Sequence, residues 1–153
     1  MLYFFFISLL AGTVSTAIMT LTEIPSWKKW GLHGVYEWHE NQAIISYLFC
    51  LSDNKKIHFI GIFFLHFLNG ILAGIAFPFI VSLFNFSAIV ISLPLLGILY
   101  GFILWILTLI PIHKPITGFS SWNHPLGHQP ALASLSGHII YGFILGLIIS
   151  FIR

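Results

Sequence analysis

Two histidines lie deep inside long apolar segments, His66 within residues 57–84 and His138 within residues 131–152. An ionisable side chain inside a membrane segment is costly, and such residues often have a function. Each histidine is followed by glycines in the pattern His-x3-Gly-x3-Gly. Residues four apart share one helix face, so both histidines should point toward a neighbouring helix. Two interpretations remain open: neutral imidazoles that bridge helices by hydrogen bonds, or groups that ligate metal or haem or relay protons.

A second group of histidines lies in two polar segments, 23–56 and 113–130, together with Glu37 and Glu40. Imidazole and carboxylate groups are good ligands for Zn, Cu or non-haem Fe. Their spacing matches no known metal motif, and such side chains are also typical of the belt at a membrane surface. Both interpretations remain open. The candidate metal ligands of the whole chain are His66, His138, His33, His39, His113, His124 and His128, and the candidate cofactors are Cu, Zn, Fe or haem.

The composition places these residues in a membrane protein. Of the 153 residues, 58% are hydrophobic and 7% are charged, against roughly 25% charged in soluble domains. Such a chain is too apolar for a soluble enzyme or a disordered segment. The net charge of +2 is too small to indicate a nucleic-acid partner. Cys50 is the only cysteine, so one chain forms neither a disulfide nor a cysteine-based zinc site.

Four apolar runs are long enough to cross a bilayer, which takes about 20 residues. They cover residues 2–22, 57–84, 87–112 and 131–152. We therefore expect an all-α, polytopic membrane protein with four transmembrane helices. The first run lacks the basic residues of a secretory signal and is taken as a true span. Because no Asp or Glu falls inside the four runs, the pattern argues against most proton- or sodium-coupled carriers.

The two halves of the chain share landmarks in the same order. Leu-Thr-Glu-Ile-Pro at residues 21–25 matches Leu-Thr-Leu-Ile-Pro at residues 107–111, and the His-x3-Gly-x3-Gly pattern follows in each half. Between these landmarks, each loop carries a tryptophan near a histidine, Trp38-His39 and Trp122-Asn123-His124. An ordered repeat of this kind predicts two tandem helical hairpins. We expect one membrane domain, 1–153, with repeat one at 1–84, repeat two at 87–153, and polar loops 23–56 and 113–130 on one side.

The charges predict how the chain is oriented in the membrane. Five of the six basic residues lie in the two long loops, and only Arg153 lies on the side of the termini and of the predicted Asn85-Phe86 turn. The positive-inside rule then places the long loops in the cytoplasm of a multi-pass protein of the cell membrane. The apolar run at residues 43–51 is too short to cross, and we expect an interfacial or re-entrant helix there.

Pairs of glycines recur at four-residue spacing within the apolar runs. Such pairs let a neighbouring backbone approach closely, which favours helix packing in a membrane. These faces can pack within one chain or against another subunit. The candidate packing residues are Gly70, Gly74, Gly97, Gly101, Gly142 and Gly146.

No catalytic motif accompanies these features: Walker A, Gly-rich dinucleotide, CxxC, HExxH and GxSxG patterns are all missing from the sequence. The favoured interpretation is a non-catalytic or accessory subunit that packs within a larger membrane complex, such as an oxidoreductase. A histidine-based metal- or haem-binding membrane protein is the alternative, and a small carrier or channel is a further one. The expected partners are the lipid bilayer and other membrane subunits or further copies of the chain, with no nucleic acid.

The second half of the chain carries a wider resemblance. Its landmarks are Gly-Ile-Leu-Tyr-Gly-Phe-Ile-Leu-Trp at 97–105, Ile110-Pro111, Gly118-Phe119 and Ser-Gly-His-Ile-Ile-Tyr-Gly-Phe-Ile-Leu-Gly at 136–146. Together with His-Phe-Leu-Asn-Gly at 66–70, they resemble a family of uncharacterised four-helix prokaryotic integral membrane proteins, a domain of unknown function. The resemblance implies the four-helix fold and the importance of both His-x3-Gly elements, and it implies no activity. The Trp-, His- and Lys-rich stretch at 27–40 departs from that family's pattern.

Overall fold

The computed structural model describes residues 2–49, 56–83, 92–120 and 123–151. These ranges are almost entirely helical and contain no strand, so the predicted all-α fold is confirmed. Four helical segments, Phe5–Gly34, Phe59–Leu83, Leu93–Thr117 and Gln129–Ser150, are long and apolar enough to cross a membrane. The elements are α1 (Leu2–Trp30), a 3₁₀ turn η1 (Gly31–Gly34), α2 (Tyr36–Leu48), α3 (Phe59–Leu83), α4 (Leu93–Thr108), a π-helical turn η3 (Leu109–His113), α5 (Lys114–Thr117) and α6 (Gln129–Ser150).

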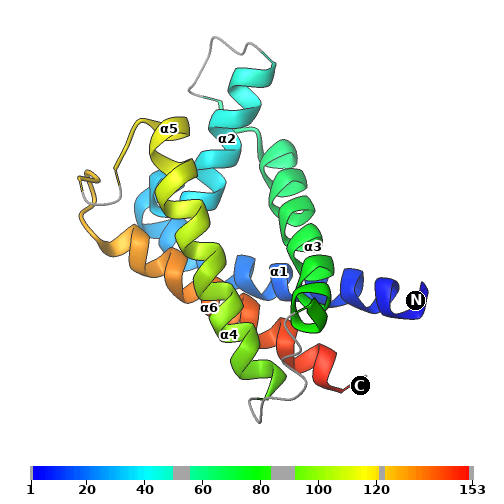
Figure 1. The fold of residues 1–153 in the computed structure, drawn as a ribbon. Coiled ribbons are helices and arrows are strands. Elements are labelled where there is room, and N and C mark those ends of the chain that lie inside the picture. The colour runs from blue at the N-terminus through cyan, green and yellow to red at the C-terminus, as the bar shows by residue number, and fades with distance from the viewer. Residues whose placement is uncertain (1, 50–55, 84–91, 121–122, 152–153) are drawn as a thin grey trace.

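The helices pack in pairs that α1 joins together. α4 packs along α6, α1 packs against both α3 and α6, and α2 packs against α3. In Figure 1 the two chain ends lie at one end of the bundle, while α2 and α5 lie at the opposite end. The tandem-hairpin arrangement and the internal repeat stay predictions, and the expected Asn85-Phe86 turn lies outside the described residues.

The contact between α4 and α6 is made by glycines, as their spacing predicts. A Cβ atom built on Gly101 would overlap the carbonyl oxygen of His138, and one on Gly142 would overlap the carbonyl oxygen of Gly97. Gly146 faces the backbone of Leu93 in the same way. Two helix backbones approach this closely only where at least one of the facing residues lacks a side chain, which is how small residues hold helices together in lipid.

Helices α1 and α3 also meet through glycines, and the hydroxyl group of a threonine takes part in their contact. A Cβ on Gly74 would approach the Gly12 Cα to 2.6 Å, and Gly70 lies against the side chain of Thr16. The Thr16 hydroxyl donates a hydrogen bond to the Gly12 carbonyl, 2.7 Å away on its own helix. All six predicted packing glycines therefore lie at close helix contacts.

Helix α1 is longer than the sequence pattern predicts. The apolar run ends near Thr22, yet the helix continues through Pro25 to Trp30. A proline inside a helix removes one backbone hydrogen bond and bends the helix but need not end it. The helix ends where Gly31 adopts φ 65°. As a result Glu23 lies inside a candidate span, only 2% exposed, and the expectation that the spans hold no acid is wrong.

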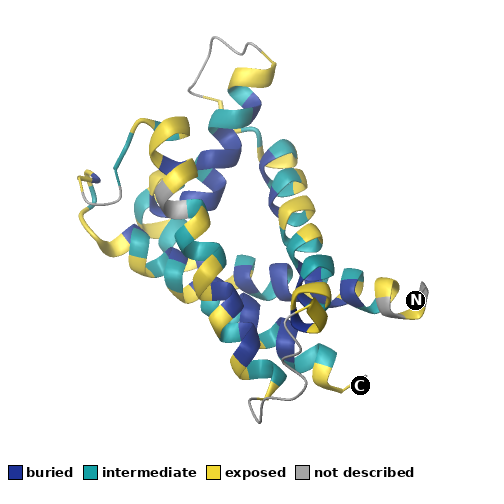
Figure 2. Ribbon diagram, viewed as in Figure 1, coloured by how far each residue is buried: buried dark blue, intermediate teal, exposed yellow. Residues whose placement is uncertain are grey.

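The buried side chains form two apolar clusters with polar groups between them. The cluster nearer the chain ends contains Ala11, Phe77 and Leu145, and the other joins Trp38 of α2 to Ile62 of α3. Figure 2 shows buried residues concentrated where α1, α4 and α6 meet and along the first half of α2. The outer faces of the long helices are exposed and apolar, as lipid contact requires.

Candidate functional site

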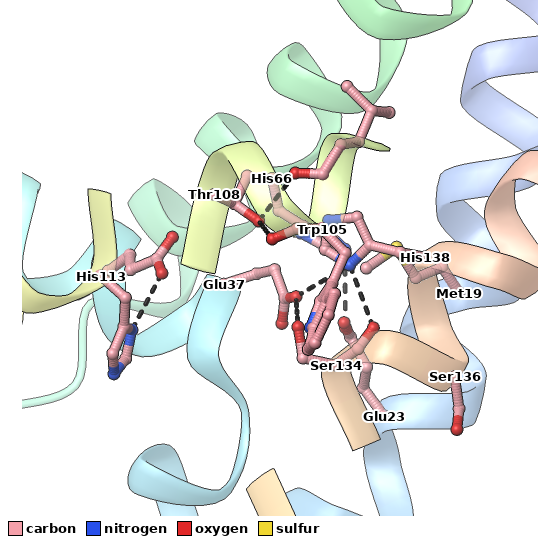
Figure 3. A network of polar contacts seen from close by, with 12 residues as sticks. Met19, Glu23, Glu37, His66, Trp105, Thr108, His113, Ser134, Ser136 and His138 are labelled. Atoms are coloured by element: carbon pink, nitrogen blue, oxygen red, sulfur yellow. Dashed lines mark hydrogen bonds and ion pairs between the residues drawn. The ribbon is translucent and has the colours of Figure 1, made fainter. Parts of the chain in front are cut away.

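All three glutamates of the chain are buried, and each is paired with a histidine from another element. An unpaired charge at such depth would cost several kcal/mol, so burial of acids requires partners of this kind. Figure 3 shows the pairs between α1, α2, α3, α6 and η3. The pairs are Glu23 Oε2 with His66 Nε2 at 3.6 Å, Glu37 Oε1 with His138 Nδ1 at 3.2 Å, and Glu40 Oε1 with His113 Nδ1 at 2.9 Å.

The pair Glu37–His138 joins α2 to α6. His138 Nδ1 lies 3.0 Å from the Ser134 carbonyl oxygen as well as 3.2 Å from Glu37 Oε1. Both neighbours are acceptors, so Nδ1 carries a proton and donates it. The Ser134 hydroxyl also donates to Glu37 Oε1. Burial raises the pKa of Glu37, but the hydrogen bond and charge of His138 and the Ser134 hydroxyl outweigh burial and hold this pKa well below its ordinary value.

The pair Glu23–His66 joins α1 to α3. The indole Nε1 of Trp38 donates to Glu23 Oε2 over 2.8 Å. His66 Nε2 lies 3.1 Å from the Thr20 hydroxyl oxygen, whose own proton is donated to the Thr16 carbonyl. Thr20 therefore accepts from His66, and the Nε2 proton lies between Thr20 and Glu23. A histidine that bridges helices by hydrogen bonds to threonine is one of the two interpretations that the sequence left open.

The carboxyl groups of Glu23 and Glu37 lie within hydrogen-bonding reach of each other. Glu23 Oε1 and Glu37 Oε2 are both buried and have no hydrogen-bond partner among the described residues. Two carboxylates in contact repel when both are ionised, and the pair holds one proton more readily than either group alone. A proton held between the two carboxyl groups would supply a partner for a buried oxygen. We call Glu23, Glu37, His66 and His138 the Glu–His centre.

Glu40 differs from Glu37, one helical turn away on α2. Burial and the negative charge of Glu37 raise the pKa of Glu40 to about 9, so Glu40 is a neutral acid at pH 7. Its hydroxyl then donates to His113 Nδ1 over 2.9 Å. At pH 7 Glu40 is therefore a proton donor and Glu37, with its lowered pKa, is a carboxylate that can accept a proton.

The pH dependence of stability should report on Glu40. The folded protein keeps the Glu40 proton up to a pKa of about 9, whereas the unfolded chain releases it near the ordinary value of 4.5. Stability should therefore fall as the pH rises between those two values. Glu40→Gln does not titrate, and its amide can still donate to His113. We expect the melting temperature of Glu40→Gln, relative to that of the wild type, to rise as the pH rises. A difference in melting temperature that does not change with pH in this range would contradict the raised pKa of Glu40.

A cavity of about 140 Å³ lies beside the Glu–His centre. Its volume suits several water molecules or a ligand of about six non-hydrogen atoms. Helices α3 and α4 both line this cavity. In the described ranges they are not among the helix pairs that pack closely together. The polar side chains on its wall include Glu37, Glu40, His66, His138, Asn69 and Thr108.

The structure divides the predicted site residues into two groups. His66 and His138 share the wall of the cavity, while His33, His39, His113 and His124 gather nearer the loops. Across the described ranges, no three His, Cys, Asp or Glu side chains are placed to hold one metal ion. Metal and haem binding at the seven candidate histidines, His128 included, stays a prediction.

Sequence reasoning missed the residues that complete the site. The apolar run stops before Glu23, which predicts a loop position for this residue, and the position of Trp38 predicts an interfacial residue or a loop landmark. Nothing in the sequence indicates that Ser134 belongs to a polar site, because a serine within an apolar run is usually a helix-packing residue. The similarity of residues 21–25 to residues 107–111 was a usable signal, because Glu23 interrupts an otherwise apolar match.

Comparisons with known proteins add no further information about this site. The chain matches no protein-family model, no curated protein and no solved structure.

Proposed function

We propose that the protein conducts protons across the membrane through its Glu–His centre. The observation that carries this proposal is the interaction between Glu23 and Glu37, two buried carboxyl groups that each lie beside a histidine. Carboxyl and imidazole groups are the side chains that form proton relays within membranes. The residues that would move the proton are thus already close neighbours.

Buried hydroxyl groups continue the path from the centre toward the chain ends. The Tyr141 hydroxyl donates to the Gly70 carbonyl over 2.6 Å, and the Tyr100 hydroxyl donates to the Ala73 carbonyl over 2.8 Å, one turn further along α3. The buried face of α1 is polar as well, with Ser8, Ser15 and Thr16 all less than 4% exposed. Polar groups therefore accompany the path through the apolar part of the bundle.

Proton conduction needs no catalytic motif and agrees with the absence of one from the sequence. It also fits the favoured sequence interpretation, because a non-catalytic subunit of a larger complex can serve as its proton path. The subunit role stays a prediction, and co-purification from native membranes tests it.

The test is proton uptake by liposomes that contain the purified protein and a trapped pH-sensitive dye. A potassium gradient with a potassium ionophore sets an inside-negative potential, and the rate of internal acidification is measured. We expect faster uptake than in empty liposomes, and a rate at least about tenfold lower for Glu37→Gln, as loss of a proton-transfer group typically causes. Asp53→Asn, which neutralises the one aspartate of the sequence, is the matched control and should retain the wild-type rate.

Two results would contradict the proposal. The first is wild-type uptake equal to that of empty liposomes. The second is a folded Glu37→Gln variant, with a cooperative melting transition, that conducts at the wild-type rate.

A further inference from the structure

Four histidines form a second cluster between the Glu–His centre and the loop end of the protein. They come from η1, α2, η3 and the segment before α6. Their rings lie against one another, and three of them also lie against Phe119. We call His33, His39, His113 and His124 the imidazole cluster. The ring centroids are 4.5 Å apart for His33–His39, 6.0 Å for His39–His113, 6.4 Å for His113–His124 and 6.5 Å for His33–His124.

The cluster leads from the surface to the interior. His33 is exposed, His39 is half-buried and His113 is fully buried. At the inner end, His113 Nδ1 is hydrogen-bonded to Glu40, whose side chain lines the cavity together with that of Glu37. The imidazole cluster and the Glu–His centre therefore form one connected series of polar groups.

Three ring nitrogens inside the cluster have no hydrogen-bond partner among the described residues. They are His39 Nδ1, His113 Nε2 and His124 Nε2, and all three are buried. Their neighbours fix two of the tautomers: His124 Nδ1 accepts from the Leu126 backbone N–H over 3.2 Å, and His113 Nδ1 accepts from the protonated Glu40. The remaining nitrogens of both rings then carry protons. Two donors and a further nitrogen in one buried cluster suit bridging water.

Burial keeps the His39 and His124 rings neutral at pH 7. Burial, helped by the charges of His33, His113 and His124, lowers the pKa of His39 to about 4. Burial likewise lowers the pKa of His124, and burial with Glu37 and Glu40 raises the pKa of Tyr36, which stacks on His113, to about 12. A neutral imidazole holds one proton and one lone pair, so it can accept a proton on one nitrogen and release one from the other.

We propose that the imidazole cluster is the proton entrance of the protein, passing protons from the loop side through His33, His39 and His113 to Glu40 and the Glu–His centre. In each step one imidazole nitrogen takes a proton from a neighbour or a bridging water and the other nitrogen releases one, so no ring keeps a net charge. Because His113 holds its proton on Nε2 and Glu40 is protonated, inward transfer begins when Glu40 passes its proton to the Glu–His centre. His113 then exchanges through bridging water to the tautomer with the proton on Nδ1 and releases that proton to the Glu40 carboxylate. This inference rests on the proposed proton conduction. A relay suits the described geometry better than a shared metal ion, since no three of these side chains converge as ligands.

The test uses His39→Phe in the same liposome measurement, because phenylalanine keeps a ring against Phe119 but cannot carry a proton. We expect uptake to fall at least about tenfold, and imidazole added to the buffer to restore most of it by replacing the missing carrier. His58→Phe, which removes a histidine from the loop-side end of α3, is the matched control and should conduct at the wild-type rate.

The outcomes separate this inference from the proposed function. If Glu37→Gln blocks uptake while His39→Phe conducts normally, the entrance lies elsewhere and proton conduction stands. A loss in His39→Phe that imidazole does not restore also overturns the entrance, because it marks a structural role. If wild-type liposomes take up no protons, both proposals fail.

Discussion

Gly142→Ala should separate α6 from α4 and destabilise the protein severely. A Cβ atom at this position would overlap the carbonyl group of Gly97 and lie 3.0 Å from the backbone nitrogen of Gly101. Backbone atoms cannot rotate away as a side chain can, so the helices have to move apart and lose the contacts along their whole interface. Overpacking typically costs about 1–3 kcal/mol, and a clash between two backbones belongs at the upper end of that range. Thermal melting in detergent measures the effect.

Gly137→Ala is the matched control on the same helix. A Cβ atom there would lie 3.3 Å from the Cγ and Cε atoms of Met19, which belong to a flexible side chain that can yield. Alanine also favours the helix by up to about 1 kcal/mol over glycine. We expect little change in melting temperature for Gly137→Ala and a large fall for Gly142→Ala. Equal melting temperatures would show that the close packing of α4 on α6 does not hold the bundle together.

Features that depend on short-range spacing could be predicted from the sequence. Glycines four residues apart share a helix face, and His66 and His138 share that face with them, so their positions follow from helix geometry. The lengths of the apolar runs predicted the four candidate spans in the same way. Each of these predictions depends on residues within a few turns of one another.

The acid–base site could not be predicted, because it depends on contacts between distant parts of the chain. Ser134 and Glu37 are 97 positions apart, and His113 and Glu40 are 73 positions apart. The end of α1 was the decisive error. A span that ends at residue 22, where the apolar run stops, places Glu23 in a loop and hides the evidence for an acid inside the membrane. The helix continues past Pro25, and the Trp38 indole supplies the hydrogen bond that the Glu23 carboxyl group needs at this depth.

His138→Leu should be strongly destabilising, and a second substitution should rescue it. The pKa of Glu37 lies well below its ordinary value because of His138 and Ser134, so Glu37 is ionised at pH 7. Removing the histidine leaves that buried charge without its main partner, and breaking a buried ion pair by deleting one member costs about 3–5 kcal/mol. His138→Leu alone should therefore lower the melting temperature greatly.

Glu37→Gln removes the charge while keeping the shape of the side chain and an acceptor for the Ser134 hydroxyl. The double variant His138→Leu/Glu37→Gln then buries no uncompensated charge, and it should regain most of the stability that His138→Leu loses. The two substitutions should couple by about 3 kcal/mol in a double-mutant cycle, the upper end of the range expected for groups in one buried network. Additive losses would show that Glu37 and His138 are not an ion pair. In that case the Glu–His centre would hold its protons on isolated groups, and the shared proton between Glu23 and Glu37 would lose its physical basis.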